Sequence, residues 1–154
     1  MTHAKEFVRI MRQLEPLLRR HRPLKSTPFE DLCDYLAWYW NKGTLAYVID
    51  EQGAHAVCFC RLFRHLEQFV WAGAHEPCGE FCMLELMVAD EPNAMAKIFK
   101  IFKNRWGPQK VVMWDRGERT EKGKPRMYRW DQFEKLARRL TYGLTEETVH
   151  YGSE

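Results

Sequence analysis

The chain has 154 residues, a length that suits one domain with its own hydrophobic core. Its formal net charge of +3 is too small to indicate a nucleic-acid partner. No apolar run approaches the ~20 residues of a membrane span, and the charged N-terminus does not resemble a signal peptide. Five cysteines are an odd number and do not indicate a disulfide framework. We therefore expect a cytoplasmic protein without membrane contact.

Two helices are expected at the start of the chain. Apolar residues recur at spacings of three and four over residues 3–22, and Pro16 predicts a kink or break there. A second helix is predicted to open with a capping box of Thr27 and Glu30 and to end at Gly43.

After Gly43 the apolar period changes to two, which is typical of strands. The first two strands are joined by Glu51-Gln52-Gly53, a hairpin signal. The strand nearest the middle of the chain is apolar on both faces and reads FCMLELMVA. The predicted strands are Thr44–Asp50, Ala54–Phe63, Leu66–Ala72 and Phe81–Ala89.

An amphipathic helix is predicted to begin at Asp90-Glu91-Pro92 and to end at Trp106, before Gly107-Pro108. It is expected to connect Phe81–Ala89 to a parallel neighbouring strand. A basic stretch, Arg116–Lys124, is predicted to be a loop. The remaining predicted elements are strands at Lys110–Asp115 and Met127–Trp130 and a helix from Asp131 to about Leu140.

This order predicts an α+β fold with a mixed central sheet, in which antiparallel strands precede a strand–helix–strand unit. We expect one domain over residues 1–154. Within it, residues 1–26 form the N-terminal helix and a basic linker, and residues 141–154 form a frayed tail.

Glu85 is the one charged residue in the apolar strand Phe81–Ala89. Burial disfavours the ionised carboxylate and raises the pKa of such a group toward the working pH of a general base. Acyl transfer to an amine requires a group of this kind, because a proton leaves the nitrogen as the new bond forms. The alternative is a structural glutamate that is paired with an arginine or reaches water at the sheet edge.

The succession of elements over Phe29–Leu140 resembles the GNAT superfamily of N-acyltransferases. Within it, the pattern is closest to the bacterial toxin-activating lysine acyltransferases. The resemblance rests on Glu85 in LELMVAD, on the lysine-rich helix that follows, and on His21 before a proline in RRHRPL. It implies two N-terminal helices, an antiparallel meander, and two strands that splay to admit the pantetheine of the acyl donor.

The resemblance implies that Glu85 is the general base and that His21 takes part in catalysis. His21 has a simpler interpretation as part of a solvated, cationic helix end. Trp71, Trp114 and Tyr128 are aromatic residues near the expected cleft, and we expect them to line the groove for the acceptor or the acyl chain. The donor is expected to contact Val88, Ala89, Asn93, Ala94 and Lys97.

The expected donor segment lacks the spaced glycines that hold a pyrophosphate at a helix N-terminus in this superfamily. Asp90 and Glu91 also repel phosphate, and Pro92 lacks an N–H. We therefore expect an acyl donor without a nucleotide end, such as acyl carrier protein, rather than acyl-CoA bound in the usual manner. The lysines of the following helix and the basic stretch are candidates for steering an acidic carrier, or are simply a solvated face.

Other interpretations remain open at this stage. Cys58, Cys60, Cys78 and Cys82 lie near histidines, but their spacing is not that of a zinc site, so we expect no metal. A weakly basic nucleic-acid-binding domain is the main alternative of another class, because Arg116–Arg129 mixes cations with glycine, proline and tyrosine. Glu118 and Glu121 dilute this charge, so nucleic acid is not the expected partner. A GNAT-shaped protein without catalytic activity, acting by protein contacts, is the third alternative. The expected acceptor is a small amine or a protein lysine, and the aromatic content is compatible with a homodimer.

Overall fold

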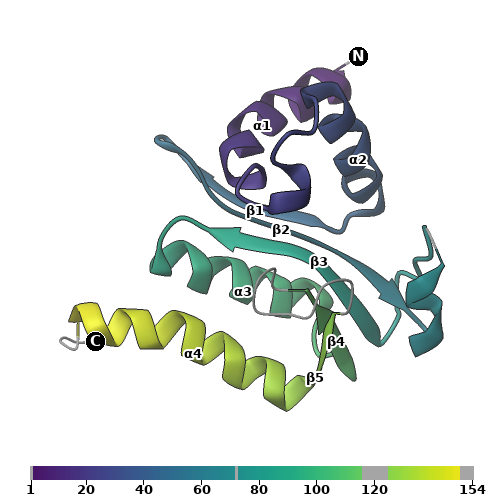
Figure 1. Cartoon of the computed structure of the whole chain (residues 1–154), viewed down its shortest axis with the longest axis vertical. Coiled ribbons are helices and arrows are strands. Elements are labelled where there is room, and N and C mark those ends of the chain that lie inside the picture. Colours follow the sequence, from purple (N-terminus) through teal and green to yellow (C-terminus); the bar gives the residue numbers. More distant parts are fainter. Residues whose placement is uncertain (1, 72, 116–124, 150–154) are drawn as a thin grey trace.

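A computed structural model describes residues 2–71, 73–115 and 125–149. Within them the chain is α+β, with four α helices and a five-stranded mixed sheet (Figure 1). Two short 3₁₀ helices complete the order. The elements are α1 (Thr2–Leu18), η1 (Arg22–Leu24), α2 (Phe29–Lys42), β1 (Leu45–Asp50), β2 (Gly53–Phe63), η2 (Leu66–Val70), β3 (Phe81–Ala89), α3 (Pro92–Trp106), β4 (Val111–Trp114), β5 (Arg126–Arg129) and α4 (Trp130–Val149).

The strands lie in the order β1-β2-β3-β4-β5. All neighbours are antiparallel except β3 and β4, which run parallel and are joined by α3. This confirms the predicted parallel strand–helix–strand unit. On β3, the residues paired with β4 are Phe81–Leu84, so β3 continues from Glu85 to Ala89 beyond the end of β4.

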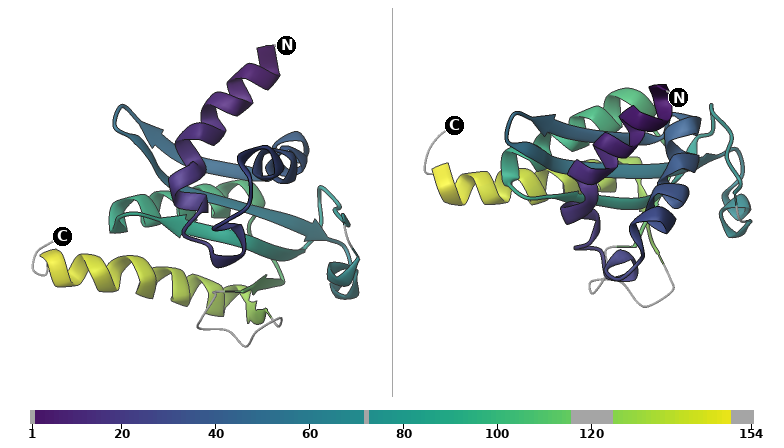
Figure 2. Two further views of the ribbon diagram at one scale, coloured as in Figure 1. Left: turned by 45° about the horizontal axis from the view of Figure 1, so that its top comes forward. Right: turned by 90° about the horizontal axis from the view of Figure 1, so that it is seen from above.

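Helices cover both faces of the sheet. α1 and α2 lie over one face, and α3 and α4 lie over the other (Figures 1 and 2). Successive side chains of β2 point to opposite faces of the sheet and so contribute to both hydrophobic cores. Cys58 and Cys60 pack toward α3 and α4, whereas Val57 and Phe59 pack toward α1 and α2. Burial on both faces explains why β2 and β3 are almost continuously apolar.

The predicted strand Leu66–Ala72 is wrong, because Leu66–Val70 forms the 3₁₀ helix η2; Ala72 lies outside the described residues. Gln68 explains the difference. Its side-chain oxygen accepts hydrogen bonds from the backbone N–H groups of Arg64 and His65, at 2.9 and 2.8 Å. Such local bonds offer the backbone an alternative to a sheet ladder.

Three details at helix ends also differ from the predictions. α1 ends at Leu18 rather than at residue 22, and Pro16 lies inside its last turn. The predicted capping box at Thr27 is absent, since the N-cap of α2 is Pro28 and no side chain caps the helix. α4 continues to Val149, so residues 141–149 are helical rather than frayed. The predicted loop Arg116–Lys124 lies outside the described residues.

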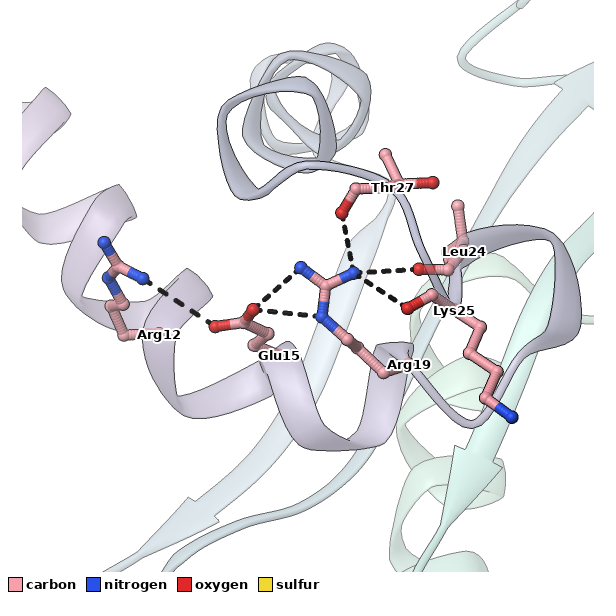
Figure 3. Close-up of polar contacts among 6 residues, drawn as sticks. All are labelled: Arg12, Glu15, Arg19, Leu24, Lys25 and Thr27. Atoms are coloured by element: carbon pink, nitrogen blue, oxygen red, sulfur yellow. Dashed lines mark hydrogen bonds and ion pairs between the residues drawn. The ribbon is translucent and has the colours of Figure 1, made fainter.

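The side chain of Arg19 makes several bonds to the linker after α1 (Figure 3). Its guanidinium binds Glu15 through Nε and Nη2, at 3.0 and 2.8 Å. Its Nη1 donates to the carbonyls of Leu24, Lys25 and Thr27, at 3.0, 3.3 and 2.7 Å. Arg19 therefore fixes the path of the segment that carries His21.

Within the described part of the chain, no helix has both the length and the apolar character that crossing a membrane requires.

Candidate functional site

A β-bulge places Glu85 on the face of the sheet that α1 and α2 cover. Phe59 and Cys60 are consecutive on β2, but their partners on β3 are Leu86 and Leu84, so Glu85 is the extra residue. Leu86 belongs to the core under α1 and α2, and Glu85 contacts α2 as well. Two consecutive side chains thus point to one face. Bulges of this kind re-aim side chains and occur often beside active sites.

Glu85 is fixed through one of its two oxygens. Arg61 Nε on β2 donates to Glu85 Oε2 at 2.6 Å, and the hydroxyl of Tyr39 on α2 donates to the same oxygen at 3.2 Å. Among the described residues no hydrogen bond reaches Oε1. The side chain of Glu85 is 16% exposed and that of Arg61 is 13% exposed. Little of either side chain is therefore exposed to solvent. Arg61 supplies the positive charge that a mostly buried carboxylate needs.

Arg61 also connects Glu85 to η2. Its Nη1 donates to the carbonyl of Trp71 at 3.1 Å, and its Nη2 donates to the carbonyl of Phe69 at 3.2 Å. All three nitrogens of the guanidinium are thus engaged, which suits the rigid fork of arginine. Two of these bonds are structural, because they attach η2 to the sheet beside the carboxylate.

Aromatic rings surround the carboxylate on the α2 side. Tyr39 is packed against Tyr35 and Phe59, with ring centroids 5.5 and 4.7 Å away. Burial is the main cause that raises the pKa of Tyr39, and the negative charge of Glu85 adds to it. The phenol therefore stays protonated and donates to Glu85. Tyr35, whose pKa is also raised by burial, is 42% exposed and forms the outer edge of this cluster.

The structure does not join His21 to Glu85 by a hydrogen bond or ion pair among the described residues. His21 is half-buried, in the turn between α1 and η1. Burial lowers its pKa, and Asp115 at the end of β4 partly opposes this effect. The neighbouring Arg20 reaches the end of β3, where its Nη1 donates to the carbonyl of Ala89 at 3.3 Å. The segment thus lies near the ends of β3 and β4, and no hydrogen bond or ion pair among the described residues joins it to Glu85.

The predicted donor residues occupy the end of β3 and the first turns of α3. Val88 packs at the edge of the core under α1 and α2, and Ala94, in the first turn of α3, is buried in the core on the other face. Asn93 is exposed. Lys97 lines a groove of about 540 Å³ between α3 and α4, together with Lys100, Lys103 and Arg138. This groove lies over α3 and α4, on the opposite face of the sheet from Glu85.

Among the three predicted aromatic groove residues, Trp71 is connected to Glu85 through Arg61. Its backbone is bonded to Arg61, and the residue is 58% exposed. Trp114 and Tyr128 are buried on the other face, where Trp114 contacts the rings of Phe99 and Phe133. Both residues therefore belong to the hydrophobic core under α3 and α4.

The cysteines on the strands are core residues. Cys58, Cys60 and Cys82 have no exposed surface, and burial raises the pKa of Cys58 and Cys60 far above that of a free thiol. Thiols in this state are poor nucleophiles and poor metal ligands. This matches the interpretation of alternating cysteines as small apolar residues.

Sequence reasoning missed Tyr39 and Arg61 as partners of Glu85. Arg61 did carry a signal, because it is the one charged residue in the apolar strand Ala54–Phe63, just as Glu85 is in its own strand. Two lone charges of opposite sign on strands of one sheet indicate a pair. Tyr39 carried no such signal, since it fits the apolar face of its helix.

No protein-family model matches the chain, and no curated protein or solved structure shows significant similarity to it.

Proposed function

We propose that the chain is a GNAT-like N-acyltransferase that acts on an amine, with Glu85 as the general base. The order of elements supports the proposal: two helices, three antiparallel strands, and a parallel strand–helix–strand unit. The observation that carries it is the bulge at Glu85. It places a carboxylate at the point where β4 stops pairing with β3, with Oε2 fixed and Oε1 not engaged by the described residues.

The chemistry assigned to Glu85 is proton transfer. The amine nitrogen attacks the carbonyl carbon of an acyl thioester, the carbon–sulfur bond breaks, and the thiolate leaves as a new amide forms. Glu85 Oε1 accepts the proton that the nitrogen loses, and Arg61 and Tyr39 hold the carboxylate in place. Oε2 is unsuited to this role, because it already accepts two hydrogen bonds.

The donor in this proposal is an acyl thioester without a bound nucleotide, such as acyl carrier protein, and acyl-CoA is its alternative. α3 begins with Pro92 after Asp90 and Glu91, and both acidic residues are exposed there. This helix N-terminus is unfavourable for a pyrophosphate. The lysines of the groove between α3 and α4 are too remote from the Glu85 face to be assigned to the donor. The proposed compartment is the cytoplasm.

The acceptor in this proposal binds beside η2. Tyr35, Val70 and Trp71 are large apolar residues with 42, 66 and 58% of their surface exposed. Arg61 holds the η2 carbonyls next to Glu85, so this exposed apolar edge borders the carboxylate. His21 is assigned no chemical step, because no hydrogen bond or ion pair joins it to Glu85 among the described residues.

The test is acyl transfer to lysine-containing peptides and proteins, with acyl carrier protein and acyl-CoA as alternative donors and mass spectrometry as the readout. Glu85→Gln keeps the shape of the side chain and its bonds to Arg61 and Tyr39. We expect it to lower the rate by roughly 10²–10⁴-fold, as loss of a general base does. Glu80→Gln is the matched control, since Glu80 is 64% exposed and pairs only loosely with Lys110 at 3.7 Å.

Equal rates in wild type and Glu85→Gln would overturn the assignment of Glu85. Absence of transfer with every donor, in a folded wild-type protein, would overturn the enzyme proposal itself. It would favour the alternative of a non-catalytic module that acts by protein contacts.

A further inference from the structure

A second polar cluster lies at the opposite end of the sheet from η2, where the β1–β2 hairpin meets the turn from β3 into α3. His55 on β2 is its centre. Its Nε2 lies 2.8 Å from Asp50 Oδ1, and its Nδ1 lies 3.0 Å from Asp90 Oδ2. Glu91 is the third carboxylate of the cluster. The imidazole is 17% exposed, whereas Asp50 and Asp90 are 55 and 39% exposed, so solutes reach the cluster from outside.

The cluster has more acceptors than a neutral imidazole has protons. One ring nitrogen of neutral histidine carries a hydrogen and the other carries a lone pair. The hydrogen satisfies one carboxylate, and the lone pair then faces the other carboxylate oxygen across about 3 Å. Two lone pairs repel at that distance. A cation at one of the two ring nitrogens, either a second proton or a metal ion, relieves this repulsion.

The positions of the donor atoms favour Nδ1 as the metal-binding nitrogen. One ligand atom each from His55, Asp90 and Glu91 lies within 4.8 Å of the other two. Asp50 lies on the other side of the ring and accepts from Nε2. Metal-binding histidines typically donate their remaining N–H to a carboxylate in this way, which fixes the tautomer and the ring orientation.

The backbone holds these side chains together. The N–H of Asp90 donates to the carbonyl of His55 at 2.9 Å, and Ala56 and Ala89 are paired across β2 and β3. The N–H of Gln52 donates to Asp50 Oδ1 at 2.8 Å. Glu91 is the N-cap of α3, and its carbonyl accepts from Met95 at 3.0 Å. Asp50 and His55 thus lie on strands, and Asp90 and Glu91 lie in the two-residue turn that connects β3 directly to α3.

We propose that His55, Asp90 and Glu91 bind a divalent transition-metal ion, with Asp50 orienting the imidazole. One imidazole and two carboxylates, completed by water, suit Zn²⁺ and its first-row neighbours better than Mg²⁺ or Ca²⁺, which prefer oxygen ligands alone. Bound metal would connect the hairpin, β2 and the start of α3.

The test is calorimetric titration of Zn²⁺ into metal-free protein at about pH 8, where free imidazole is neutral. All proteins carry Cys78→Ser, because Cys78 is an exposed thiol that competes for zinc. His55→Gln keeps hydrogen bonding within the cluster but removes the imidazole ligand, so it separates metal binding from folding. We expect at least a tenfold loss of affinity in His55→Gln and in Asp90→Asn, and a loss on the order of tenfold in Asp50→Asn.

Asp31→Asn is the matched control, since Asp31 is an exposed carboxylate in the first turn of α2. It should leave zinc affinity unchanged. A Zn²⁺-dependent rise in melting temperature, present in the control and absent in His55→Gln, is the second readout. Equal zinc affinity in all variants would overturn the site. So would the absence of binding to the folded protein, which would leave a second proton as the cation between His55 and Asp90.

Discussion

Arg61 and Glu85 lie on adjacent antiparallel strands but are not direct cross-strand partners. Arg61 is opposite Met83, and Glu85 is the extra residue of the bulge two positions further along β3. The 2.6 Å ion pair therefore runs diagonally between the strands. It connects the bulge to η2, because the same guanidinium binds the carbonyls of Phe69 and Trp71.

Replacing Arg61 by alanine should destabilise the fold by about 2–3 kcal/mol. The substitution leaves the mostly buried carboxylate of Glu85 without a counter-charge and removes the hydrogen bonds to two backbone carbonyls. This loss is smaller than the roughly 3–5 kcal/mol expected when a fully buried ion pair is broken, because both side chains retain some solvent exposure. Urea unfolding followed by circular dichroism measures the difference. Arg64→Ala should change stability by less than about 0.5 kcal/mol, since Arg64 is 69% exposed and 4.0 Å from its partner. A loss for Arg61→Ala no larger than for Arg64→Ala would refute the structural role of the pair.

Arg19→Ala should cost about 1–2 kcal/mol, because three carbonyls of the linker and Glu15 lose a charged donor. The linker should also become more accessible to proteases, since its path between α1 and α2 depends on these bonds. Arg22→Ala is the comparison: Arg22 is an exposed cation of the same linker. Limited proteolysis and urea unfolding measure both effects. Equal behaviour of the two variants would contradict the assigned role of Arg19.

The sequence predicted most of the fold because the hydrophobic period is strong where elements are buried. Phe81–Ala89 was predicted with the bounds that β3 has, and α3 was predicted from its acidic start to Trp106. The errors lie where side chains bond to nearby backbone or to distant segments. Gln68 turns an apparent strand into η2, and Arg19 rather than Thr27 organises the entry to α2. Such bonds leave no periodic pattern.

The candidate site was less predictable than the fold. Glu85 stood out, because a lone charge in an apolar strand requires a partner. The identity of that partner depends on the bulge, which shifts the register by one residue and has no signal in the sequence. The same limit applies to Trp114 and Tyr128. Aromatic residues on a short strand gave no indication of which face of the sheet they occupy.

Gly79 is predicted to be intolerant of any side chain. A Cβ atom at this position would overlap the backbone of Phe63, which is the last residue of β2. The loop before β3 lies so close to β2 that only glycine fits, and a methyl group would have to move the backbone of one of them. We expect Gly79→Ala to cost more than about 2 kcal/mol by urea unfolding. Gly73→Ala should cost about 1 kcal/mol, since its φ of 74° is strained for alanine but the space is open. A smaller loss at Gly79 than at Gly73 would contradict this packing.

His75 should make the fold less stable in mild acid. Its Nδ1 accepts a hydrogen bond from the backbone N–H of Leu62 at 3.2 Å, which requires a lone pair on that nitrogen. Burial is the main cause that lowers the pKa of His75, and Lys42 adds to the effect. Because the folded-state pKa lies below the unfolded value of about 6.5, the unfolded chain binds more protons in this range. The stability that neutral His75 contributes is fully present above about pH 6.5, and it is lost as the pH falls through the folded-state pKa.

The variant that isolates this effect is His75→Asn, whose side-chain oxygen takes the place of Nδ1 as acceptor but does not titrate. Between about pH 7.5 and 5.5 its free energy of unfolding should fall less than that of wild type. His21→Asn is needed beside it, because burial lowers the pKa of His21 too and gives the same sign of pH dependence. The two contributions should add, since no contact joins these histidines among the described residues. A pH dependence that is the same in His75→Asn and in wild type would show that the Leu62 bond survives protonation, and the neutral-imidazole assignment would fail.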